Sequence, residues 1–174
     1  MSNLNNKTIS LCILVLILAF SRLIPHPPNF TPLLGMAVFS GVIFDRKIFA
    51  LVIPLVAMLL SDLVIGFHSS MPIIYFAIML NVAVGFLLVS KFSYLKSILA
   101  LVSGAVIFFI VTNFAVWLGS SYYPQDLSGL IACYIMGLPF FQNTLLSTLM
   151  YGLGAFYLFN LFEKKILNLS QKSL

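Results

Sequence analysis

Long apolar runs separated by short polar breaks occupy most of the chain, and their lengths predict helices that cross a membrane. A helix needs about 20 apolar residues to cross about 30 Å of hydrocarbon. The predicted spans are residues 8–24, 33–44, 48–63, 72–90, 97–118 and 139–162. The stretch 127–138, which lies between two prolines, is predicted as a short helix along the membrane surface. The fold class is therefore all-α, a polytopic membrane protein with one six-helix domain over residues 1–174.

The run at residues 33–44 is shorter than a normal span and rich in small residues. Ala37 and Gly41 form a small-xxx-small pair of the kind that lets a second helix approach closely. We therefore expect a short helix packed inside the bundle. The pattern leaves open whether this helix crosses the whole bilayer.

Composition excludes a soluble domain, because 61% of the residues are hydrophobic and only 7% are charged, against about 25% charged in soluble proteins. The nine basic residues are scattered and form no basic, aromatic stripe, which argues against nucleic acid as a partner. Eight of them fall in the tails and the second and fourth loops, on the side opposite Arg22. By the positive-inside rule both termini are predicted to face the cytoplasm.

Polar residues converge on the opposite, outer side. Residues 22–32 contain the run Pro-His-Pro-Pro, which cannot be helical and predicts a stiff loop. Irregular backbone near a membrane persists where protein or a water-filled cavity satisfies its polar groups. We therefore expect an outward-facing pocket covered by this loop. The candidate substrate-binding residues are Arg22, Asn29, Asp62, His68, Asn113, Trp117 and Asn143.

Each candidate has a functional and a structural interpretation. Arg22 could bind an anionic group or serve as a snorkelling anchor. Asp62 could accept from a ligand or orient Arg22, and its natural partner is Arg22 or His68; a plain bond between helices is the alternative. The asparagines could read polar edges of a ligand or join helices, and Trp117 could stack on a ring or belong to an interfacial belt.

Catalytic and metal-binding patterns are missing from the sequence. It contains no H-E-x-x-H, G-x-S-x-G or phosphate-binding glycine loop, and it has two histidines only. We therefore predict no enzyme, no cofactor and no metal site, and rank an intramembrane enzyme using His26 or His68 as a base below the other hypotheses. Active transport would need energy from another polypeptide.

The order of these features resembles the S components of energy-coupling factor (ECF) vitamin transporters, which are small bacterial six-helix proteins with cytoplasmic ends. It appears here as Arg22, the proline loop, a small-residue helix, Ser61-Asp62 and Gly66 before a break with proline. Residues 25–32, with the sequence PHPPNFTP, and 137–141, with the sequence GLPFF, are also similar to an uncharacterised bacterial membrane-protein family near the S components.

The resemblance implies a solute-binding subunit of a vitamin-type importer in the bacterial inner membrane. Its partners would be a small organic solute, the lipid bilayer and the ECF transmembrane and ATPase subunits. The alternative is a structural or assembly membrane protein without a small-molecule ligand, whose outer loops bind another membrane protein.

Overall fold

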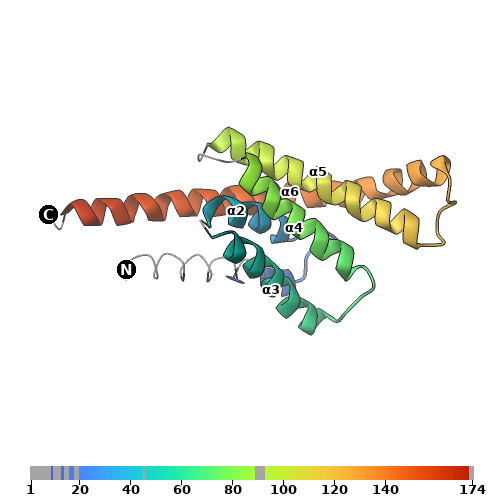
Figure 1. The fold of residues 1–174 in the computed structure, drawn as a ribbon, viewed down its shortest axis with the longest axis horizontal. Coiled ribbons are helices and arrows are strands. Elements are labelled where there is room, and N and C mark those ends of the chain that lie inside the picture. Colours follow the sequence, from blue (N-terminus) through green and yellow to red (C-terminus); the bar gives the residue numbers. More distant parts are fainter. Residues whose placement is uncertain are drawn as a thin grey trace.

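The computed structural model describes residues 9, 13, 16, 17, 20–44, 46–88 and 93–172, with side chains described up to residue 163. The elements in these ranges are all helical (Figure 1). They are the 3-10 turn η1 (Ser21–Leu23) and the helices α2 (Leu33–Ile43), α3 (Lys47–Ile65), α4 (Met71–Leu88), α5 (Tyr94–Gly119) and α6 (Leu127–Lys172). The all-α fold class is therefore confirmed.

Four of these helices, α3 to α6, are long and apolar enough to cross a membrane. They cover the predicted spans at 48–63, 97–118 and 139–162 and residues 72–88 of the predicted span 72–90. The predicted span 8–24 lies largely outside the described residues, so a bundle of six spans stays a prediction.

The short helix α2 is the centre of the bundle. Every residue from Leu33 to Gly41 is buried, and α2 packs against each of α3, α4, α5 and α6. A Cβ atom added to Gly41 would lie 2.2 Å from the carbonyl oxygen of Val82, and one added to Gly85 would lie 2.3 Å from that of Val38. The absence of side chains at these two positions lets α2 and α4 touch through their backbones. Gly41, one residue of the predicted small-xxx-small pair, lies at this contact, and Ala37, the other, is fully buried.

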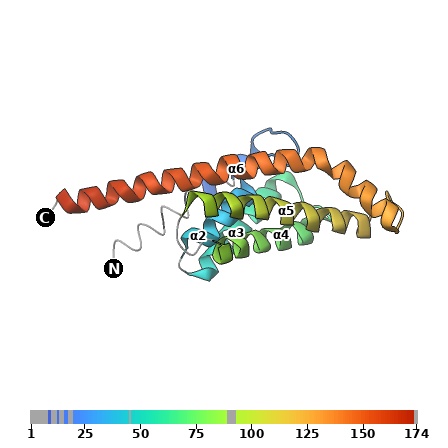
Figure 2. The ribbon, with the colours of Figure 1, turned by 90° about the horizontal axis from the view of Figure 1, so that it is seen from above.

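The sequence-based expectation for residues 127–138 is wrong. They form no separate surface helix but the first part of α6, which runs on through Pro139 to Lys172. Proline inside a helix removes one backbone hydrogen bond and bends the axis without ending the helix where neighbouring packing holds it. The N-terminal third of α6 indeed changes direction (Figure 2).

The connections divide between the two ends of the bundle. The end of α2 and the start of α3 lie at the end of the bundle toward which α6 extends, as do the end of α4 and the start of α5 (Figure 1). The α3–α4 and α5–α6 connections lie at the other end (Figure 1). Arg46, Lys47 and Lys96 belong to the first end. The candidate site is built at the second.

Candidate functional site

A buried ion pair joins the segment before α2 to α3. The Nη1 group of Arg22 donates to the Asp62 carboxylate, to Ser61 Oγ at 2.9 Å and to Met58 Sδ at 3.1 Å. The hydroxyl of Tyr75 in α4 donates to the other carboxylate oxygen at 3.1 Å. Asp62 is fully buried, whereas the Arg22 side chain is 14% exposed. Water does not reach the Asp62 carboxylate, so the positive charge of Arg22 compensates its negative charge.

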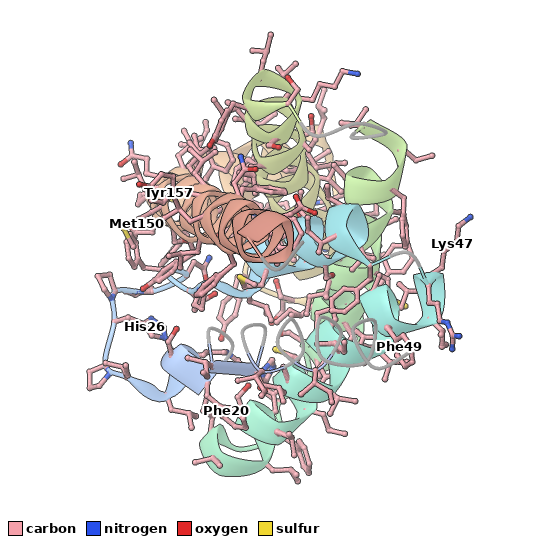
Figure 3. All side chains as sticks on the ribbon, turned by 90° about the vertical axis from the view of Figure 1, so that its left-hand side faces the viewer. Phe20, His26, Lys47, Phe49, Met150 and Tyr157 are labelled. Atoms are coloured by element: carbon pink, nitrogen blue, oxygen red, sulfur yellow. The ribbon has the colours of Figure 1, made fainter. Side chains whose placement is uncertain are left out.

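The proline loop, residues 24–32, is fastened to α6. Asn143 Nδ2 donates to the carbonyl oxygen of Pro28 at 2.9 Å, and Ser147 Oγ donates to that of Asn29 at 3.4 Å. Asn29 has φ 61°, a left-handed conformation that asparagine tolerates better than most residues. Figure 3 labels His26 on this loop, where its ring nitrogens lie 2.9 Å from the carbonyl oxygen of Pro27 and 3.1 Å from that of Arg22.

A cavity of about 700 Å³, here called the main cavity, opens between the start of α4, the second half of α5 and the first half of α6. Its wall combines aromatic and aliphatic side chains with amide and hydroxyl groups. The lining residues that matter below are Asn29, Phe108, Asn113, Ala115, Tyr123 and Thr144. No charged side chain lines it in the described part of the chain.

A second cavity of about 160 Å³, here called the side cavity, adjoins the first. Arg22, His26, Thr31 and Ser147 contribute its polar groups. Both cavities share part of their lining, namely Asn29, Ile74, Phe108 and Thr144. The two cavities therefore lie next to each other beneath the proline loop.

The structure brings only some of the predicted binding residues to these cavities. Arg22 lines the side cavity, Asn113 the main cavity and Asn29 both. Asp62 lines neither and holds Arg22 in place, while the exposed His68 lies in the α3–α4 turn and does not pair with Asp62.

The two remaining candidates make structural hydrogen bonds. Asn143 holds the proline loop. Trp117 Nε1 donates to the carbonyl oxygen of Pro124 at 2.9 Å, which closes the α5–α6 connection. Neither side chain lines a cavity among those described.

Asp126 begins α6 as its N-terminal cap. Its carboxylate accepts from the Ser128 hydroxyl at 2.7 Å and from the Gly129 N–H at 2.8 Å. These two hydrogen bonds hold the pKa of the Asp126 carboxyl below its ordinary value. The cap fixes the start of the helix that forms one wall of the main cavity.

Several polar residues of the site were not among the predicted ones. Of these, Tyr75 binds Asp62, and Thr144 and Ser147 line the cavities from α6. Thr144, Ser147 and the buried Thr148 are spaced i, i+3, i+4 in α6. That spacing places three polar groups on one helix face and was a usable signal in the sequence.

These features define an all-helical protein whose long helices suit a membrane and whose cavities lie at one end of the bundle. Residues 2–171 match a family described as a family of unknown function (DUF6580), and the chain belongs to that family. No curated protein and no solved structure matches the chain.

Proposed function

We propose that the protein is a membrane-embedded solute-binding subunit of a vitamin-type importer, which takes up a small organic molecule in the main cavity. The observation that carries this proposal is the main cavity itself, with about 700 Å³ of space and a wall of aromatic and aliphatic side chains interrupted by amide and hydroxyl groups. Binding sites for small molecules measure about 300–1,000 Å³ and combine apolar walls with a few polar groups. The fit in size and lining favours a ligand the size of a vitamin.

The orientation follows from the charges at the two ends. Arg46, Lys47 and Lys96 lie at the end opposite the cavities. With basic ends in the cytoplasm of a bacterial cell, both termini are cytoplasmic and the cavities open outward. The ligand then enters from outside, beneath the proline loop.

The protein binds and does not catalyse. Energy for uptake comes from a separate membrane partner with ATPase subunits, as the resemblance to ECF S components implies. The main cavity has the polar groups to orient a ligand, in particular the Asn113 amide. Asn113 Nδ2 already donates to the carbonyl oxygen of Phe109 at 2.8 Å, so its oxygen is the atom left to accept from a ligand.

The test is mass spectrometry of compounds retained by protein purified in mild detergent after incubation with a bacterial metabolite extract. Ala115→Phe adds a ring to the wall of the main cavity without removing a hydrogen bond. Leu118→Phe, at a 62% exposed position of α5 outside both cavities, is the matched control. We expect wild type and Leu118→Phe to retain a compound that Ala115→Phe loses. Retention of nothing by wild type would favour the structural or assembly protein.

A further inference from the structure

Arg22 has donor groups that its ion pair does not use. All three of its hydrogen bonds in the described part of the chain come from Nη1. Nε and Nη2 carry three more N–H bonds, and none has a partner among the described residues. Arg22 lines the side cavity, and these N–H groups are the donors that its side chain has left to offer a ligand there.

The charges around the side cavity favour an anion. No carboxylate lines it among the described residues, and Asp62, the counter-ion of Arg22, is fully buried and is not among the lining residues of either cavity. The guanidinium of Arg22 is therefore the group on this wall that can hold an acid.

The main cavity differs from the side cavity in charge. Aromatic, amide and hydroxyl groups line it, and it has no charged side chain in the described ranges. The side cavity, at about 160 Å³, has the volume of about five waters. It is large enough for one acid group and small for a ring system. Phe108 and Thr144 line both spaces, so the two cavities lie next to each other.

We infer that the ligand is an organic acid with two unlike parts: a carboxylate or phosphate held by Arg22 in the side cavity, and an uncharged ring-containing body in the main cavity. This inference rests on the proposed function and deepens it, because it names the chemical class of the solute. Charge-assisted hydrogen bonds from a guanidinium supply the anchor, and stacking on the aromatic wall holds the body. Asp62 and Tyr75 position the guanidinium and do not touch the ligand.

The experiment separates a bacterial metabolite extract by anion exchange into an acidic fraction and a fraction of neutral and cationic compounds. Each fraction is incubated with wild type, with Ala115→Phe and with the double variant Arg22→Gln/Asp62→Asn. The double variant removes both charges at once, so no lone buried charge remains. Its thermal unfolding is measured alongside. Inorganic phosphate alone, added to wild type, separates a free anion from an acid group on a larger solute.

We expect wild type to retain a ring-containing acid from the acidic fraction only, and both variants to retain it at least about tenfold less. Inorganic phosphate should not displace it at equal concentration. Wild-type retention from the neutral fraction only would overturn the inference while leaving the proposed solute binding intact. Equal retention by wild type and a folded double variant, or displacement by phosphate, would also overturn it. Retention from neither fraction would refute the proposed function itself. If the double variant does not fold, the comparison of the two fractions on wild type still decides.

Discussion

The substitution Asp62→Ala should destabilise the protein strongly. It leaves the Arg22 guanidinium without its counter-ion and removes the acceptor of the Tyr75 hydroxyl. Removing one partner of a buried ion pair costs about 3–5 kcal/mol. Arg22 keeps 14% of its side chain exposed, so some hydration remains and the lower end, about 3 kcal/mol, applies.

The double variant Arg22→Gln/Asp62→Asn should lose much less, because neither charge remains and the two amides can still bond. The assay is thermal unfolding in mild detergent, in which a loss of about 3 kcal/mol corresponds to a melting temperature lower by roughly 6–12 °C. An Asp62→Ala protein that melts with the wild type would refute the reasoning. A double variant less stable than the single one would refute it equally.

Three further predictions concern the helices and the loop. Gly41→Ala places a methyl group against a backbone oxygen of α4 and should lower the free energy of unfolding by about 1–3 kcal/mol or more. The control Gly154→Ala should be neutral or stabilising, because no atom lies within 4 Å of its new Cβ. Asn143→Ala removes a tether of the proline loop and should speed amide hydrogen exchange at residues 26 and 29–31, whereas the neighbouring change Gln142→Ala should leave this exchange unchanged. For Asp126, the folded-state pKa is lowered, so its contribution to stability is present above the unfolded pKa and declines as pH falls through the folded one. The melting difference between wild type and Asp126→Ala should therefore shrink between pH 7 and pH 3, and a constant difference would contradict the cap.

The sequence predicted the main elements because each rests on a strong local signal. Four apolar runs became membrane-length helices, and the small residues around Gly41 marked the buried helix. The requirement that a buried carboxylate have a partner pointed to Arg22 or His68 for Asp62. The structure decides for Arg22, since His68 lies exposed in a turn.

The phase of each helix about its own axis was harder to predict. Neighbouring residues on a helix point about 100° apart, so Asn143 faces the proline loop while Thr144 faces the cavities. An apolar helix with polar residues on adjacent positions does not reveal which of them faces inward. The same limit explains why Trp117 was expected in the site, although the cavity wall nearby is formed by Tyr122 and Tyr123.

Pro139 failed as a predictor because its effect depends on packing. The residue removes one hydrogen bond donor, but contacts with α5 on both sides of it hold the helix together. Gly137 lies close to α5, where a Cβ atom would come 2.4 Å from Asn113 Oδ1, and Gly152 approaches Leu101 in the same way. Such contacts between distant segments are not visible in a local pattern.

The most direct test of the account is cysteine labelling in intact cells, in a background with Cys12 and Cys133 replaced by Ala. Ser69→Cys lies on the rim of the main cavity, and Lys96→Cys is exposed at the other end of the bundle. We expect a membrane-impermeant maleimide to label Ser69→Cys from outside the cell, and metabolite extract to slow this labelling. Lys96→Cys should react only after the cells are opened. Labelling at Lys96→Cys alone, or labelling at Ser69→Cys that extract does not slow, would contradict an outward-facing cavity that binds a solute.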